Sequence, residues 1–306
     1  MNEQKNLLLA IVASLIILLI FQYLFPTERK MIEENVEAEN QIKEVPQEKI
    51  LDREEIVKNN KRIYFSESSR IKGSISLIGA RFDDVILKDY KDTIKPESRQ
   101  VTLLSPNNTL NPYFVELGWM SQENINLPNK NSEWQLIEGK ELGPENHITI
   151  KWVSPEGIEF FRKIEVDKDY LITVEQKVTN VSNKDISLTQ YGRINRTGTP
   201  KTSGFYILHE GPIAVLNERL IEIDYDDIIE EGSKSIISKG GWVGITDKYW
   251  LAALIPDQRS RIEGGFKAVL KNIERYQAQY TSNEIVLEKG ETASVKSNVF
   301  IGAKEV

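Results

Sequence analysis

The chain has 306 residues, of which 40% are apolar and 28% are charged. This composition supports one folded core of about 200 to 250 residues, or two smaller cores, and excludes a disordered or fibrous chain. The formal net charge of -7, without a stripe of Lys and Arg, argues against a nucleic-acid-binding surface. With no cysteine and only His147 and His209, the sequence excludes disulfides, thiolate chemistry and a His-rich zinc site.

The first predicted element is an apolar helix over residues 7–25, which contain no charged side chain. At about 1.5 Å per residue it would span roughly 28 Å, close to a ~30 Å hydrocarbon core. A cleavable signal peptide has a shorter apolar stretch and a pair of small residues at its exit, which residues 22–26 lack. We therefore predict an uncleaved membrane helix after a short N-terminus at residues 1–6. A buried soluble helix is the weakest alternative.

The charges beside this helix leave its orientation open. Lys5 and the terminal amine precede it, whereas Arg29 and Lys30 follow it. This count slightly opposes an inside N-terminus, but large domains cross membranes largely regardless of local charge.

Residues 26–60 predict a flexible linker. They are rich in glutamate, contain Pro46 and lack aromatic side chains, so they bury too little surface to offset the entropy of ordering. The simplest interpretation is a solvated tether that is at most transiently helical. An acidic arm for a basic partner is the alternative.

Short β segments with polar turns between them follow Lys61. Residues 158–166 alternate between apolar and polar side chains, residues 170–178 resume the alternation after a polar turn, and Ile186 and Leu188 continue it. We interpret these segments as three consecutive antiparallel strands. Further strands are predicted at residues 70–77, 82–87, 147–153, 204–208, 241–246, 250–255, 276–280 and 292–301.

Helical periodicity is weak throughout this part of the chain. Residues 226–231 and 267–275 come nearest to a helical period, and turn-like breaks recur every 8 to 15 residues or so. The spacing predicts a mainly β domain over residues 61–306, built as a twisted antiparallel sandwich.

Familiar catalytic motifs are missing from the sequence. The nucleophile motif Gly-x-Ser-x-Gly does not occur, Ser74 lies in an ordinary strand pattern, and no phosphate-binding glycine loop is present. Two groups of acidic residues lack the spacing of a calcium loop, and we interpret them as solvated loop charge: Asp83 with Asp84, and Asp224 with Asp226 and Asp227.

His209 and Glu210 form the most unusual pair, because a Gly-Pro break follows them. An imidazole beside a carboxylate can act as an acid/base pair. However, neighbouring residues of a strand point to opposite faces, so a structural histidine is the preferred interpretation.

Several strings of residues resemble the bacterial YidC family of membrane protein insertases. The most specific is Gly-Trp-Val-Gly-Ile-Thr-Asp-Lys-Tyr-Trp, which opens residues 241–256. The other matching strings are residues 4–9, 191–194, 206–212 and 300–306. The resemblance therefore runs from one end of the chain to the other.

The resemblance implies a cytoplasmic N-terminus, a single span of the inner membrane in this chain, and a periplasmic β-supersandwich similar to galactose mutarotases. It implies contacts with the lipid bilayer, nascent membrane proteins and Sec translocon components, and no cofactor or metal. In this family, insertion belongs to five later membrane helices that surround a positively charged groove. No residue of this chain matches that groove, so we expect the N-terminal part of an insertase without its insertion core.

The mutarotase likeness also suggests two alternatives, a peptide- or carbohydrate-binding domain and an enzyme. Mutarotation requires a proton donor and a proton acceptor, and His147 has no evident partner in the sequence. We therefore expect a non-enzymatic domain. The candidate binding residues, for a cleft or a partner surface, are Tyr191, Arg193, His209, Glu210, Trp242, Tyr249 and Trp250.

Overall fold

The structure, a computed structural model, describes residues 50–201, 208–270 and 272–305. The predicted membrane helix, most of the linker and most of the strand expected at residues 204–208 lie outside these ranges. Within the described ranges, neither helix has the length and apolar composition that crossing a membrane requires.

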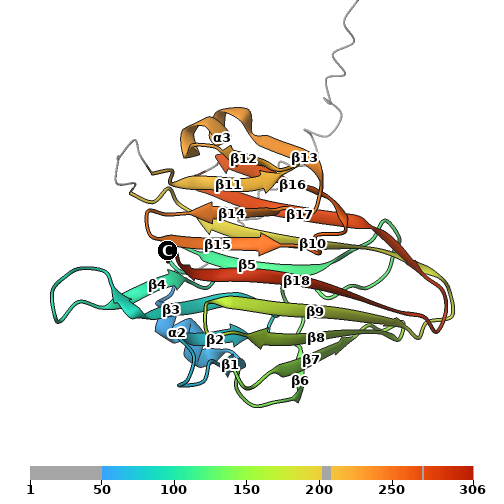
Figure 1. Cartoon of the computed structure of the whole chain (residues 1–306). Helices are drawn as coiled ribbons and strands as arrows, with labels where there is room; N and C mark the ends of the chain where they lie inside the picture. Colours follow the sequence, from blue (N-terminus) through green and yellow to red (C-terminus); the bar gives the residue numbers. More distant parts are fainter. Residues whose placement is uncertain (1–49, 202–207, 271, 306) are drawn as a thin grey trace, which may run out of the picture. The chain divides into compact units, whose positions relative to one another are not determined.

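Two antiparallel sheets form the domain (Figure 1). Sheet 1 runs in the order β1 (Arg62–Tyr64), β2 (Ile71–Ser76), β3 (Phe82–Lys91), β5 (Tyr113–Met120), β10 (Ile186–Thr197), β17 (Glu274–Leu287), β16 (Arg261–Leu270) and β13 (Ser233–Lys239), with β4 (Gln100–Leu104) paired to β3. Sheet 2 runs in the order β12 (Arg219–Glu222), β11 (Gly211–Leu216), β14 (Trp242–Thr246), β15 (Trp250–Ile255), β18 (Thr292–Ala303), β9 (Leu171–Asn180), β8 (Ile158–Val166), β7 (Ile148–Val153) and β6 (Gln135–Glu138).

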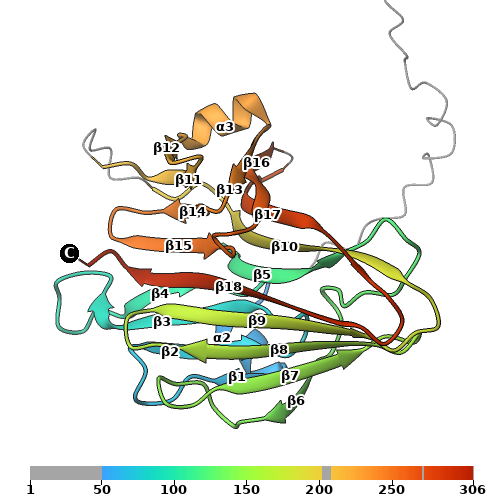
Figure 2. The ribbon, with the colours of Figure 1, turned by 45° about the vertical axis from the view of Figure 1, so that its right-hand side comes forward.

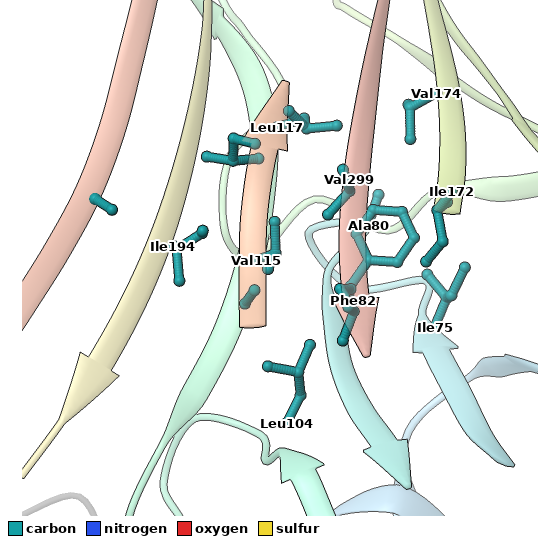
Figure 3. Packing of buried hydrophobic residues seen from close by; sticks show 14 of the residues in the cluster. Ile75, Ala80, Phe82, Leu104, Val115, Leu117, Ile172, Val174, Ile194 and Val299 are labelled. Atoms are coloured by element: carbon teal, nitrogen blue, oxygen red, sulfur yellow. The ribbon is translucent and has the colours of Figure 1, made fainter. Parts of the chain in front are cut away.

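The core lies between the two sheets. The edge strands β12 and β13 lie at one end of the sandwich, and the edge strands β6 and β1 lie at the other end (Figure 2). Alternation along each strand places one row of side chains inside, as in β8, where every second residue is buried. Figure 3 shows Phe82 and Val115 of sheet 1 near Ile172 and Val299 of sheet 2, all of them fully buried. The mainly β antiparallel sandwich predicted from the sequence is therefore confirmed.

Residues 158–188 lie in three consecutive strands, as predicted, but the three strands do not share one sheet. β8 and β9 pair as expected, but β10 crosses to sheet 1, where it lies between β5 and β17. The crossing is fixed at Asn180, whose side-chain amide donates to the carbonyls of Lys184 (2.8 Å) and Leu287 (3.0 Å). Alternation places a residue inside or outside, but it does not identify the sheet.

Most of the other predicted strands are present as β2, β3, β7, β14, β15, β17 and β18. The strands that were not predicted are β1, β4, β5, β6, β11, β12, β13 and β16. The helical tendency at residues 226–231 is confirmed by α3 (Tyr225–Glu231). The tendency at residues 267–275 was misleading, because residues 267–270 lie in β16 and residues 274–275 lie in β17, where pairing between the two strands overrides local periodicity.

A short helix precedes sheet 1. This helix, α2 (Arg53–Asn59), lies in residues predicted to belong to the flexible linker. The Asp52 side chain accepts a hydrogen bond from the Glu54 amide and so caps the first turn. The Leu51 amide donates to the Asn108 carbonyl at 2.9 Å, so contacts with the domain begin before Lys61.

Candidate functional site

An apolar groove of about 590 Å³ lies on the side of sheet 2 that faces away from the core. Side chains that line the groove alternate with core side chains along β15. Leu251 and Ala253 line the groove, whereas Ala252 and Leu254 are fully buried in the core. The lining residues are Asp169, Tyr170, Trp242, Leu251, Ala253, Ile255, Phe300, Ala303, Lys304 and Glu305. A concave surface with apolar walls and a few charges at its rim suits an apolar peptide segment.

The floor of the groove depends on a glycine in β18. A Cβ at Gly302 would lie 2.3 Å from the Tyr170 ring, so the ring can lie against this strand only because position 302 has no side chain. Tyr170 also packs edge-on against Phe300, with ring centroids 6.3 Å apart, and carries the Arg70 guanidinium 4.4 Å from its centroid.

The end of β18 is clamped beside the groove. Arg70 donates to both carboxylate oxygens of Glu305, at 2.6 and 2.8 Å, and the Tyr90 hydroxyl donates to the same group at 2.5 Å. These hydrogen bonds lower the pKa of the Glu305 carboxyl to about 2. Lys304 donates from Nζ to Thr246 at 3.0 Å, and burial lowers the pKa of its amine.

Three of the predicted site residues lie in or near this groove. Trp242 lines it. Trp250 packs against Tyr90, with ring centroids 5.0 Å apart, and so supports the clamp around Glu305 rather than the groove wall. Tyr249 packs edge-on against Trp250, and its carbonyl accepts a hydrogen bond from the Lys304 amide at 2.9 Å.

Tyr191 and Arg193 lie on sheet 1, away from the groove. The Arg193 guanidinium stacks on the Tyr191 ring, 4.3 Å from its centroid. The Tyr191 ring lies over Gly118, and burial raises the pKa of its hydroxyl. The small cavity that Tyr191 shares with Glu116 and Arg162 has a volume of only about 10 Å³, which is room for a single water.

His209 and Glu210 have different partners. His209 Nε2 lies 2.9 Å from the Pro212 carbonyl, and its Nδ1 lies 3.6 Å from the Asp224 carboxylate. The Glu210 carboxylate accepts a hydrogen bond from the Lys248 amide at 3.1 Å. None of these contacts joins His209 to Glu210, so they give no support to an acid/base pair.

The two histidines lie towards opposite ends of sheet 2. His147 precedes β7, His209 precedes β11, and five strands separate β11 from β7 in the sheet order. The expectation that His147 has no partner was wrong, because its Nε2 lies 3.1 Å from Glu138 in β6. Hydrogen bonds from Thr149 and then from His147 lower the pKa of Glu138. This pair is a contact at the edge of the sheet.

The interpretation of Asp83 and Asp84 as solvated loop charge was also wrong. Both lie in β3, only 6% and 1% exposed, and form ion pairs with Arg62 and Arg53 respectively. A bulge in β3 makes Asp83 the extra residue between Asp84, which lies opposite Ser74, and Phe82, which lies opposite Ile75, and the Ser74 hydroxyl lies 2.5 Å from the Asp84 carboxylate.

The second acidic group remains exposed as expected, with Asp224, Asp226 and Asp227 at the start of α3. Across the part of the chain that the structure describes, no cluster of three or more histidine, aspartate or glutamate side chains could hold a metal ion.

Comparison with known proteins gives one consistent family. Residues 67–306 match the family described as the YidC periplasmic domain. Two curated relatives named membrane protein insertase YidC, from Rickettsia akari and Rickettsia prowazekii, are each 40% identical over 100% of this chain. The chain spans 56% of the length of each of them.

Solved structures confirm the fold. A galactose mutarotase related enzyme from Lactobacillus acidophilus covers 80% of this chain with a TM-score of 0.52 and 10% identity. A galactose mutarotase-like protein from Lactobacillus casei covers 79% with a TM-score of 0.52 and 9% identity. Each of these chains is matched over its full length. At such low identity the likeness concerns the fold alone.

Proposed function

Because the chain belongs to the YidC family of membrane protein insertases, we propose that it forms the N-terminal part of such an insertase and helps inner-membrane proteins to insert and fold. The family match over residues 67–306 and the identity with the curated insertases over the whole chain support this function. We assign insertion itself to the part of those relatives that this sequence does not span.

The proposed topology is an N-terminus in the cytoplasm, a membrane helix at residues 7–25, and the β domain in the periplasm. The apolar composition of residues 7–25 and the periplasmic description of the matching family support it. Since the chain has no cysteine, a single Glu97→Cys variant gives one reactive site on an exposed loop. A maleimide that crosses only the outer membrane should label it in intact cells. Labelling only after the inner membrane is opened would refute this topology.

We further propose that the domain is a docking platform beside the Sec translocon, and that the groove at Trp242 and Phe300 receives apolar segments of nascent membrane proteins. The single observation that carries this role is the groove's volume of about 590 Å³ and its apolar lining on an outer sheet face. Apolar side chains that leave water for such a groove gain about 25 cal/mol per Å² of buried surface.

Photocrosslinking in cells tests this role. A photoreactive amino acid at Leu251, in the groove wall, should give adducts with Sec components or nascent membrane proteins. The same amino acid at Phe161, on the outward face of β8 in the same sheet, is the control and should give none. Absence of adducts at Leu251, or equal adducts at both positions, would remove the groove from the proposal.

We infer that the domain is not a mutarotase, although the fold is shared. The separation of His147 and His209 in sheet 2 supports this inference, because mutarotation requires a proton donor and a proton acceptor at one ring. A purified fragment of residues 49–306 should show no anomerase activity by polarimetry. Activity that disappears in His209→Ala would establish the enzyme instead, whereas binding of a sugar or peptide without turnover would favour a binding domain.

A further inference from the structure

Two arginines on the N-terminal side of sheet 1 reach two neighbouring aspartates of β3. Arg62 pairs with Asp83, and Arg53 pairs with Asp84. Arg62 belongs to β1, an edge strand of sheet 1, whereas Arg53 belongs to helix α2. The two pairs therefore fasten consecutive parts of the same segment to one strand.

The two pairs differ in how deeply they are buried. In the first pair the side chain of Arg62 is 1% exposed, and Arg62 also donates from Nε to the Ser74 hydroxyl at 2.7 Å. In the second pair the Asp84 side chain is also buried, at 2% exposed, but the Arg53 side chain is 23% exposed. The Ser74 hydroxyl donates at 2.5 Å to the other oxygen of the Asp84 carboxylate, Oδ2, whereas Arg53 contacts Oδ1. The outer arginine can therefore leave while its partner retains a donor.

Helix α2 has little else to hold it. None of its residues is buried, and a helix of 7 residues is too short to be stable alone in water. The Leu51 amide bond to Asn108 is a further contact of this segment with the domain. The helix also has two half-buried apolar side chains, Ile56 and Val57. Of these contacts with the domain, the pair of Arg53 and Asp84 is the one that reaches a buried charge.

We propose that residues 50–60 are a releasable strap, docked by the pairing of Arg53 with Asp84. The strap ends at Lys61, whose carbonyl accepts a hydrogen bond from the Leu77 amide at 2.9 Å and whose ammonium pairs with Glu133. When the strap opens, α2 unfolds and joins the preceding linker, while Arg62 and β1 stay in the sheet. The open strap adds roughly 40 Å of extended chain, at about 3.4 Å per residue. Given the proposed membrane anchor at residues 7–25, docking of the strap limits how far the domain reaches from the bilayer.

Hydrogen exchange measured by mass spectrometry on the full chain tests the strap. In Arg53→Met, amide exchange over residues 50–60 should rise at least tenfold, while β2 and β3 keep the exchange rates of the unaltered chain. Lys58→Met is the matched control, since Lys58 is an exposed cation of the same helix. It should exchange like the unaltered chain, and Arg53→Lys should lie between the two.

Two outcomes would overturn the proposal. Unchanged exchange in Arg53→Met would show that other contacts hold α2. Faster exchange in β3 as well as in α2 would show that Arg53 supports the sheet rather than a separable strap. If Arg53→Met fails to fold because Asp84 is left without its cation, Arg53→Met combined with Asp84→Asn removes both charges, and it should restore β3 while leaving α2 free.

Spin labels give a second readout that does not involve a membrane. The cysteine-free chain accepts paired labels at Glu55→Cys and Glu97→Cys, both exposed positions. Their distance distribution should be narrow with Arg53 present and broad in Arg53→Met. A broad distance distribution in Arg53→Met, with no greater distance between the domain and a bilayer, would support the strap and refute the proposed membrane anchor.

Discussion

The guanidinium of Arg162 stacks on the ring of Trp134, 4.8 Å from its centroid, inside the sandwich. Arg162 projects from β8 in sheet 2 and donates to the Leu117 carbonyl and, at 2.8 Å, to the Ala80 carbonyl on the opposite side of the core. None of its hydrogen bonds goes to a carboxylate; the third acceptor is the Gln176 side chain. Burial lowers the pKa of Arg162 to about 10, so it remains charged at neutral pH.

Replacing Arg162 should destabilise the domain even though it removes a charge from the core, because buried carbonyls then lose their hydrogen-bond donor. In Arg162→Met the carbonyls of Ala80 and Leu117 lose their donor, at a cost of about 1–3 kcal/mol each. We expect a loss of roughly 2–4 kcal/mol in the free energy of unfolding, measured by urea denaturation of residues 49–306. Arg162→Lys should also lose stability, because one ammonium cannot reproduce the planar stack. Full stability in Arg162→Lys would contradict a specific role for the guanidinium.

The buried pair of Arg62 and Asp83 should show strong coupling. Burial, the largest influence, raises the pKa of Asp83 even though Arg62 opposes the shift. Asp83→Asn leaves Arg62 buried without an anion, which typically costs about 3–5 kcal/mol. Arg62→Met with Asp83→Leu removes both charges and should cost much less than the sum of the single changes. Additive losses in urea denaturation would show that the pair is not coupled.

The fold class was predictable from the sequence because alternation and turn chemistry are local. The alternation of residues 158–166 gave β8 its correct bounds, and residues 226–231 gave α3. The sheet to which β10 belongs was not predictable, because the Asn180 side chain joins residues far apart in the sequence. The burial of Asp83 and Asp84 was not predictable for the same reason, because their ion-pair partners, Arg62 and Arg53, belong to other elements earlier in the sequence.

Only part of the candidate site could be found from the sequence. Trp242, one of the candidate residues, lines the groove, whereas Tyr170, Leu251 and Phe300 also line it and were not among the candidates. The available signal was the continuous apolar run of β15, because an unbroken run implies a strand covered on both faces. The clamp at Glu305 carries no local signal, because Arg70 reaches it from the opposite end of the domain sequence.

The Glu305 clamp should give the domain a pH-dependent contribution to stability. The pKa of this carboxyl falls from 4.5 to about 2 on folding, so the stabilisation is complete above the unfolded value and is lost as the pH falls towards 2. The difference in urea midpoint between the unaltered domain and Glu305→Gln should therefore be larger at pH 6 than at pH 3. The control Glu291→Gln changes a carboxylate in the turn before β18, away from Arg70 and Tyr90. An equal difference for Glu305→Gln at both pH values would contradict a charged clamp.

The groove should bind apolar helical peptides through Trp242. This side chain lines the groove and lies outside the buried core, so Trp242→Ser should leave the unfolding midpoint nearly unchanged. A labelled apolar peptide should bind the altered domain at least tenfold more weakly by fluorescence anisotropy, equivalent to about 1.4 kcal/mol. Phe161→Ser makes the same kind of change on the same sheet, under Lys151 and Lys177, and should bind like the unaltered domain. Equal weakening in both variants would point to non-specific adsorption on sheet 2, because the two aromatic side chains share their chemistry and differ in whether they line the groove.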